Sequence, residues 1–292
     1  MMSVTRFAFK LTDDTSYIDL AQCLSLVQRT MVRQKQVFTV LGGQIIDNSN
    51  TQVAAKISTA PNFWYVRASV NRAFKAWKDQ RAQTLANANL DTGVGAKHVG
   101  KYADFKVTLN GVGSDSNVLP HFTGSTAVVP IAEGGEWATA SVTDEAGSEK
   151  HFKIMGNHTA TYYSATKGWL VTRTLPDAEY EPDMMDRDGD GTLDYKQDFL
   201  NLLNDTDDGQ PERLTLLYED NDNAPFAVRD MYGDVDASTN LQLQAFAYLN
   251  ANNPSHMLPG FKALCGLIQV KLDQGHSNPI LFLDVLNTPE AF

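Results

Sequence analysis

The feature that most constrains this fold is a series of short apolar segments separated by Gly, Asn, Asp, Pro and Ser. These segments are rich in β-branched and aromatic residues, which is typical of strands joined by turns. We expect strands at residues 37–41, 105–109, 126–131, 152–155, 169–172, 214–218, 266–270 and 280–283. About eight strands with few helical patterns between them favour an all-β fold, an antiparallel sandwich or jelly roll, over a parallel α/β sheet.

One long helix is expected from about residue 66 to residue 86. At 100° per residue, one stripe of this segment is apolar and consists of Val66, Val70, Ala73, Phe74 and Trp77. Pro61 precedes the helix, and a stretch rich in Asn and Gly follows it. A second, weaker helical pattern covers residues 195–203. The sequence therefore predicts a β protein with one or two helices and long loop insertions.

The chain is expected to form one domain over residues 1–292, with a surface insertion at about residues 176–212. That tract is acidic and rich in turn-forming residues. No run of about 18 apolar residues occurs, so we expect neither a membrane span nor a signal peptide. Cys23 and Cys265 form neither a zinc motif nor a CxxC pair, and we interpret both as buried thiols.

The net charge of -11 normally argues against a nucleic-acid partner, but the charge is unevenly distributed. Residues 1–101 hold 13 Lys and Arg against 6 Asp and Glu, whereas residues 102–292 hold the other 11 against 29. A fold that separates the two parts places cations beside phosphate and acids toward solvent, as in a shell with a basic inside. The alternative is a chance gradient in an acidic protein.

The basic residues of the first part form two groups. Phosphate binding needs several cations presented together, and such binding is non-specific and sensitive to salt. The alternative is the ordinary polar face of a surface helix. The candidate nucleic-acid-binding residues are Arg29, Arg33 and Lys35 in the first group, and Arg67, Arg72, Lys75, Lys78 and Arg81 on the helix.

An acidic loop at residues 186–194 resembles the core of a calcium-binding EF-hand loop. Calcium prefers six to eight oxygen ligands, and carboxylates at alternate positions before a Gly let a short loop wrap the ion. Gln197 stands where a bidentate Glu is expected, and no EF-hand helix precedes the loop. The alternatives are a Ca²⁺ site and a solvated acidic turn. The candidate ligands are Asp186, Asp188, Asp190, Thr192, Asp194 and Asp198.

No catalytic motif stands out. The six histidines are scattered without an HExxH pair, and neither a Gly-x-Ser-x-Gly elbow nor a phosphate-binding glycine loop is present. A hydrolase that uses paired carboxylates remains a third class, because 35 acidic residues guarantee some acidic pair. We therefore expect that the protein is not an enzyme.

Several segments, taken in order, resemble coat proteins of Rep-encoding circular single-stranded DNA viruses. The first is Asn62 to Val70, which continues into Arg72 to Arg81. The later ones are Tyr102 to Asn110, Gly135 to Trp137, Met155 to His158, Glu219 to Phe226 and Cys265 to Val270. No single segment is specific, but the order of five or six of them is, and together they cover about a third of the chain.

This resemblance implies a viral jelly-roll sandwich that assembles with identical copies into an icosahedral shell and packages single-stranded DNA. It also implies localisation in the virion, and in the host cell during assembly, with a host receptor that the sequence does not identify. Unlike many such proteins, this chain lacks a long Arg-rich start, because residues 1–28 hold only Arg6 and Lys10 as cations. The rival interpretation is a secreted or surface calcium-stabilised β-sandwich that binds carbohydrate or protein.

Overall fold

The computed structural model describes residues 3–47, 52–92, 102–111, 117–121, 134–143, 147–174, 241–273 and 278–292. The chain divides into two compact units, one made of Met1–Trp169 with Tyr232–Phe292 and the other of Leu170–Met231. The first unit holds all the described strands, and its fold is given below. Among the described residues, no helix is both long and apolar enough to cross a membrane.

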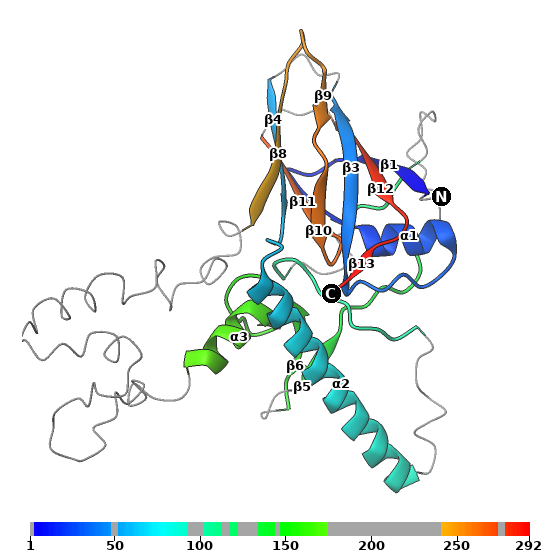
Figure 1. Cartoon of the computed structure of the whole chain (residues 1–292), viewed down its shortest axis with the longest axis vertical. Helices are drawn as coiled ribbons and strands as arrows, with labels where there is room; N and C mark the ends of the chain where they lie inside the picture. Colours follow the sequence, from blue (N-terminus) through cyan, green and yellow to red (C-terminus); the bar gives the residue numbers. More distant parts are fainter. Residues whose placement is uncertain are drawn as a thin grey trace, which may run out of the picture. The chain divides into compact units, whose positions relative to one another are not determined.

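The described residues form mostly antiparallel sheet, with three helices (Figure 1). The strands before residue 60 are β1 (Val4–Lys10), β2 (Thr15–Asp19), β3 (Gln36–Ile46) and β4 (Val53–Thr59). The middle strands are β5 (Ser141–Thr143), β6 (Glu149–Lys153) and β7 (Tyr162–Ser164). The last strands are β8 (Gln242–Leu249), β9 (Ser255–Leu258), β10 (Phe261–Leu264), β11 (Leu267–Leu272), β12 (Ile280–Leu286) and β13 (Glu290–Ala291). The helices are α1 (Leu20–Gln28), α2 (Trp64–Thr92) and α3 (Ala165–Thr174).

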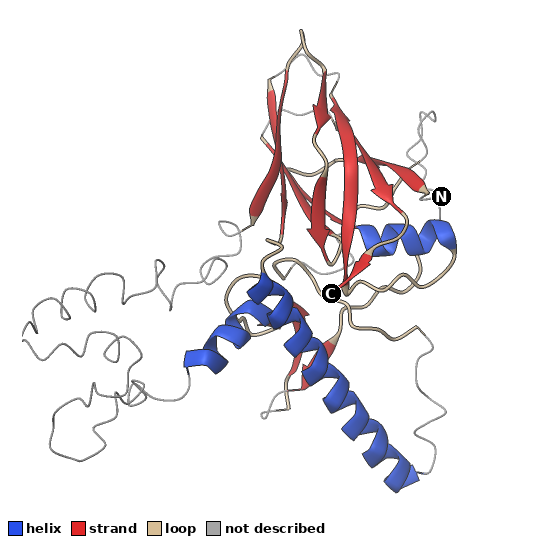
Figure 2. Cartoon of the chain, in the orientation of Figure 1, coloured by secondary structure: helices blue, strands red, loops and turns tan. Residues whose placement is uncertain are grey.

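Two antiparallel sheets form a sandwich (Figure 2). The first sheet has the order β1-β12-β3-β10, and β9 and β13 also pair with β3. Because β12 and β9 pair with the same residues of β3, they lie on opposite sides of it, and β10 continues along the side of β9. The second sheet has the order β2-β11-β4-β8. A third, small sheet has the order β5-β6-β7.

Alternating residues of the two large sheets point inward and fill the space between them. Phe7 and Phe9 of β1, Val53, Ala55 and Ile57 of β4, and Leu281, Leu283 and Val285 of β12 all belong to one buried apolar cluster. This alternation follows from the two-residue period of a strand. Burying each such Phe, Leu or Ile contributes about 1.5–3 kcal/mol relative to leaving it exposed.

Two glycines are required by close packing in the sandwich. A Cβ on Gly43 of β3 would lie 2.3 Å from the carbonyl oxygen of Phe282, so no side chain fits between β3 and β12 there. Gly266 has a φ of +69° in the turn between β10 and β11, and a Cβ there would lie 3.0 Å from the ring of Phe38. This turn carries the chain directly from the first sheet to the second. Glycine adopts the positive φ that the turn requires without steric strain.

The two ends of the sandwich differ. Because paired strands run antiparallel, the last residues of β1, β3, β8 and β11 and the first residues of β2, β4, β9 and β12 lie at one end. The other end carries α1, the turn at residues 265–266 and the start of α2. A second buried cluster joins α2 to this end, and it includes Val66, Val70, Ala73, Phe105, Phe152, Leu264 and Leu267.

The structure confirms the coarse prediction of a mostly antiparallel β fold. The strands expected at 37–41, 266–270 and 280–283 are β3, β11 and β12, and the helix expected at 66–86 is α2. The segment at 152–155 is in part β6. Residues 105–109 are buried, but only Thr108 forms a bridge, to Lys153. The strands expected at 126–131 and 214–218, the helix at 195–203 and the insertion at 176–212 lie outside the described residues.

The strand expected at residues 169–172 is wrong, because these residues belong to α3. The Ser164 side chain, just before the helix, accepts a hydrogen bond of 3.3 Å from the backbone N–H of Lys167. Such an N-cap satisfies a donor that has no partner within the helix. This cap stabilises the start of a helix in a segment where the apolar run predicted a strand.

Candidate nucleic-acid interface

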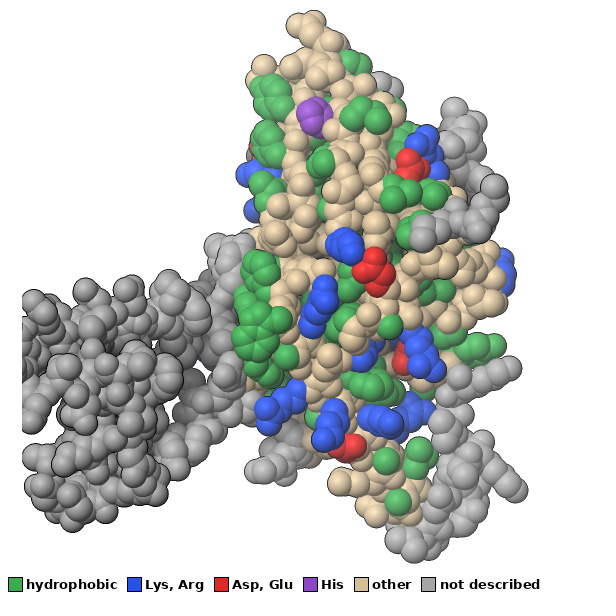
Figure 3. All heavy atoms as spheres, viewed as in Figure 1, with side chains coloured by type: hydrophobic (Ala, Val, Ile, Leu, Met, Phe, Trp, Pro, Cys, Tyr) green, Lys and Arg blue, Asp and Glu red, His purple; other side chains and the backbone are tan. Residues whose placement is uncertain are grey.

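The predicted basic residues of α2 fall into exposed and engaged subsets. Arg72, Lys75 and Lys78 are exposed, and among the described residues none of them has an acidic partner within 4.0 Å. Arg67 is partly buried, and its Nε donates a hydrogen bond of 2.7 Å to the side chain of Asn62. On the face shown in Figure 3, Lys and Arg side chains gather in the lower half of the described surface.

The upstream basic group is also divided. Arg33 is exposed. Lys35 is engaged within the chain, because its Nζ donates to the backbone oxygen of Phe292 at 3.2 Å and lies 4.9 Å from the ring centroid of Phe74. Arg29 is exposed and ends α1 in the left-handed conformation, with a φ of 54°. Of this group, Arg29 and Arg33 therefore keep exposed cations.

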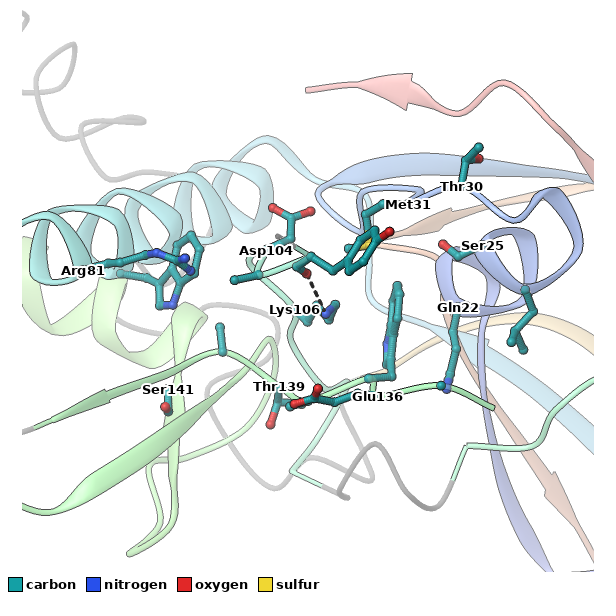
Figure 4. A pocket seen from close by; sticks show the side chains of 18 of the residues that line it. Gln22, Ser25, Thr30, Met31, Arg81, Asp104, Lys106, Glu136, Thr139 and Ser141 are labelled. Atoms are coloured by element: carbon teal, nitrogen blue, oxygen red, sulfur yellow. Dashed lines mark hydrogen bonds between the residues drawn. The ribbon is translucent and has the colours of Figure 1, made fainter. Parts of the chain in front are cut away.

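A cavity of about 700 Å³ brings Arg29 and Arg81 to one place. It is lined by α1, by α2 and by the segments at residues 102–106 and 135–141. In Figure 4, Lys106 lies near its centre, with Arg81 on one side and Gln22 and Ser25 of α1 on the other. The structure thus places one member of each predicted basic group on the wall of the same cavity. Its volume lies in the range of small-molecule sites.

Aromatic side chains line this cavity together with the cations. Trp77, Tyr102 and Trp137 all contribute to its wall. The guanidinium of Arg81 lies 5.4 Å from the Trp77 ring centroid, and Nζ of Lys106 lies 4.6 Å from that of Trp137. Cations over aromatic faces at these distances attract the ring electrons, which holds the charged groups in place.

Lys106 is an unusual part of the wall because it is buried, with 6% of its surface exposed. Its Nζ carries three N–H donors, but within the described part of the chain it makes one long hydrogen bond, of 3.5 Å, to the backbone oxygen of Tyr102. Burial lowers the pKa of Lys106, and the charges of Asp104, Asp19 and Glu136 oppose that shift. An incompletely paired buried ammonium costs stability. Nearby, Oδ2 of Asp104 is buried without a hydrogen-bond partner.

Asp19 fixes the inner wall of the cavity. Its Oδ1 accepts from the backbone N–H groups of Ala21 and Gln22, which caps α1. Its Oδ2 accepts from the side chains of Gln34 at 2.9 Å and Trp137 at 2.8 Å. Burial raises the pKa of Asp19 to about 6, although these four hydrogen bonds lower it. The carboxylate therefore joins α1, the entry to β3 and the segment that carries Trp137.

Gln34 extends this connection to the wall segment that carries Lys106. Besides donating to Asp19, its side chain donates to the backbone oxygen of Val107 at 2.9 Å and accepts from the N–H of Val107 at 2.5 Å. Gln34 is 1% exposed. This pairing fixes the position of Lys106 relative to α1.

The predicted calcium ligands Asp186, Asp188, Asp190, Thr192, Asp194 and Asp198 all lie outside the described residues. Within the part of the chain that the structure describes, no group of three or more His, Cys, Asp or Glu side chains is arranged to hold a metal ion. Calcium binding stays a prediction about residues 186–198.

Comparisons with family models, with curated proteins and with solved structures found no match for this chain.

Reasoning from single residues missed much of the cavity wall. Lys106 alternates with apolar Phe105 and Val107, a pattern that predicts a solvent-facing side chain, yet both faces of this segment are buried. Tyr102 and Trp137 entered only as parts of segments that carry the family resemblance. Asp19 and Trp137 are 118 residues apart, and no local pattern signals their contact.

Proposed function

We propose that this chain is a viral coat protein with a jelly-roll fold, which assembles with identical copies into a closed shell around single-stranded DNA. The observation that carries the proposal is the strand order of the sandwich. If β9 and β10 count as one strand, the eight main strands pair first with last: β1 with β12, β2 with β11, β3 with β9 and β10, and β4 with β8.

That pairing is the one expected when a long antiparallel hairpin of eight strands is rolled into two sheets. Rolling brings the eighth strand beside the third and the seventh beside the fourth, which matches the pairs β12 with β3 and β11 with β4. Eight-stranded jelly rolls occur in viral capsid proteins, lectins and cupins. The strand order therefore supports the jelly roll, and the family resemblance favours the capsid among these three.

The interior of the sandwich also supports a structural role. Apolar side chains from both sheets fill it, which leaves any ligand to bind outside the two sheets. A shell protein needs a rigid unit with complementary outer surfaces rather than an internal cavity. The exposed cations Arg72, Lys75 and Lys78 on α2 supply the surface that we assign to the genome.

Assembly is tested by measuring the mass of the purified chain and by imaging it. Light scattering during size exclusion, over a range of salt and calcium concentrations, is expected to give a species far larger than 32.2 kDa. Electron microscopy of that species is expected to show closed shells of uniform diameter. A chain that stays monomeric under all of these conditions contradicts the proposal.

DNA packaging is tested by reversing charge on α2. Lys75→Glu with Lys78→Glu is expected to lower the nucleic acid that co-purifies with particles, because repulsion replaces two phosphate contacts. The matched control is Lys56→Glu with Lys271→Glu, two exposed lysines paired across β4 and β11. Equal nucleic-acid content in particles of the α2 variant and of the wild type contradicts the role of this helix.

The calcium prediction is tested by thermal melting with calcium and with a chelator. An ion that binds only the folded chain raises the melting temperature. An unchanged melting temperature would contradict the calcium prediction. If calcium does raise the melting temperature, Asp188→Asn with Asp190→Asn is expected to abolish that shift.

The second candidate function is a surface or secreted β-sandwich that binds carbohydrate. One observation favours it: Trp77, Tyr102 and Trp137 line one cavity, and aromatic faces stack on sugar rings as well as on bases. A monomeric chain that binds oligosaccharides through this cavity would replace the coat-protein proposal.

A further inference from the structure

We propose that the cavity between α1 and α2 binds one nucleotide of single-stranded DNA, with the base against its aromatic side chains and the phosphates on either side of the base at Arg29 and Arg81. This inference rests on the proposed function, since it states where the packaged strand is held. The base would stack in the cavity, whereas the exposed face of α2 would make only non-specific phosphate contacts.

The cavity has the chemistry that single-stranded nucleic acid requires. Proteins that bind such strands combine cations that follow the backbone with aromatic side chains on which bases stack. Here Trp77, Tyr102 and Trp137 supply the rings. Tyr102 is 63% exposed, so part of its side chain is accessible from solvent.

Two arginines contribute cations to the wall of the cavity. Arg81 is placed by its contact with Trp77, and Arg29 by the end of α1. Both belong to the cavity, whereas Arg72, Lys75 and Lys78 do not line it. A strand with one phosphate at Arg29 and another at Arg81 would bridge α1 and α2, so binding would link these two helices.

Lys106 supplies independent support for a polar ligand. Among the described residues, its buried ammonium is matched by one long hydrogen bond and the Trp137 ring, and a buried ammonium without full hydrogen bonding costs free energy. Groups kept at the expense of stability are concentrated at binding and catalytic sites. A ligand with hydrogen-bond acceptors, such as a phosphate or the oxygens and ring nitrogens of a base, would accept hydrogen bonds from the remaining N–H groups of Nζ.

The experiment compares two probes with the full chain after nucleic acid has been stripped in high salt. One probe is an oligothymidylate of about ten nucleotides, and the other is an abasic strand with the same phosphates. Binding is followed by quenching of tryptophan fluorescence and by anisotropy of a label on the strand. The inference predicts tighter binding of the strand with bases, together with quenching that the abasic strand does not produce.

Variants at Tyr102 separate stacking from charge. Tyr102→Ala is expected to weaken binding of oligothymidylate by about tenfold and binding of the abasic strand by less than about twofold, because one stacking face is lost. Tyr102→Phe keeps the ring and is expected to bind as the wild type does. Tyr248→Ala on β8, an exposed tyrosine outside the cavity, is the matched control.

Variants of the cations separate the cavity from the helix surface. Arg29→Gln with Arg81→Gln is expected to weaken both probes and to abolish the quenching. Lys75→Gln with Lys78→Gln is expected to weaken both probes by a similar factor and to leave the quenching at saturation unchanged. If the two pairs behave alike in every readout, the cavity is not a nucleotide site.

Lys106→Met tests whether this residue serves binding rather than folding. The variant is expected to melt at or above the wild-type temperature and to bind oligothymidylate several-fold more weakly. A large drop in melting temperature with unchanged binding by the folded fraction would assign Lys106 to the fold and would contradict its role here.

The outcomes distinguish this inference from the proposed function. Particles that package DNA while the Tyr102 and arginine variants bind both probes as the wild type does would overturn the nucleotide site alone. A monomeric chain that still shows quenching dependent on bases would overturn the shell and keep the site. Quenching by oligosaccharides and not by oligothymidylate would overturn the inference in favour of carbohydrate binding.

Discussion

The interior of the sandwich and the cavity between α1 and α2 differ in the polarity of their buried side chains. Between the sheets, buried side chains such as Phe9, Ile57 and Leu283 are apolar and need no partners. Around the cavity, Asp19, Gln34 and Lys106 are equally buried but polar. Burial of the first kind stabilises the fold, whereas burial of the second kind costs free energy unless every donor and acceptor is paired.

Buried polar groups that lack hydrogen-bond partners indicate where a ligand could bind. Asp19 is fully provided with donors, so its burial is explained by capping α1 and fixing Trp137. Lys106 and Asp104 are not fully paired, so the fold alone does not explain them. The predictions below test whether the two regions respond to substitution as this contrast requires.

The largest effect is expected from the sandwich interior. Phe9→Ala is expected to lower the free energy of unfolding by about 3–5 kcal/mol, because the fully buried ring leaves a cavity between the sheets. Leu243→Ala, at a position 54% exposed on β8, is the control and is expected to cost less than about 1 kcal/mol. Urea denaturation measures both. Similar costs for the two would show that Phe9 is not part of the interior.

The next effect is expected at Gln34. Gln34→Leu keeps the volume but leaves the N–H and C=O of Val107 and one oxygen of Asp19 without this partner, at a cost of about 2–4 kcal/mol. Gln83→Leu, at an exposed position on α2, is the matched control and is expected to be nearly neutral. A neutral Gln34→Leu would mean that the sandwich and the segment that carries Lys106 are not joined through this side chain.

A pH dependence is expected from Asp19. Its folded-state pKa of about 6 lies above the ordinary value of 3.8, so the folded chain binds more protons than the unfolded chain between these values. Stability from this group is therefore fully present below about pH 4 and is lost as the pH rises through about 6, by up to about 3 kcal/mol. The stability of the wild type relative to Asp19→Asn is expected to fall over this range in urea titrations. A constant or rising difference would contradict the shift.

The smallest effect is expected from an exposed ion pair of the sandwich. Lys262 and Glu290 lie 2.9 Å apart, but their side chains are 48% and 56% exposed. Solvent and salt screen such a pair, so Lys262→Gln is expected to change the free energy of unfolding by about 0.5 kcal/mol or less. A larger loss would mean that the contrast between exposed and buried polar groups drawn above is wrong.

The strands of the sandwich were predictable where the sequence carries a dense apolar run. The segments that became β3, β11 and β12 carry dense apolar runs between turn residues, and such runs report burial directly. The strands β1, β2 and β4 were not identified in this way. In β1 and β4 the buried residues are followed or preceded by the exposed Arg6 and Lys56, and β2 buries the polar Ser16, so none of the three shows a long apolar run.

The cavity was predictable only in part. The basic residues Arg29 and Arg81 could be found because clusters of cations are visible in a sequence. The cavity where they meet could not be predicted, because its wall combines α1, α2 and the segments at residues 102–106 and 135–141, which are far apart in the sequence. Long-range contacts such as Asp19 with Trp137 leave no periodic signal, and Lys106 carries a signal that indicates solvent rather than burial.

The central claim is that eight rolled strands form a unit that closes into a shell. Electron microscopy of the purified full chain, with the mass of the same sample measured by light scattering, tests it most directly. The account predicts closed particles of uniform diameter and a mass of many copies of the 32.2 kDa chain. A single population at the mass of one chain, in low and high salt and with and without calcium, would contradict it.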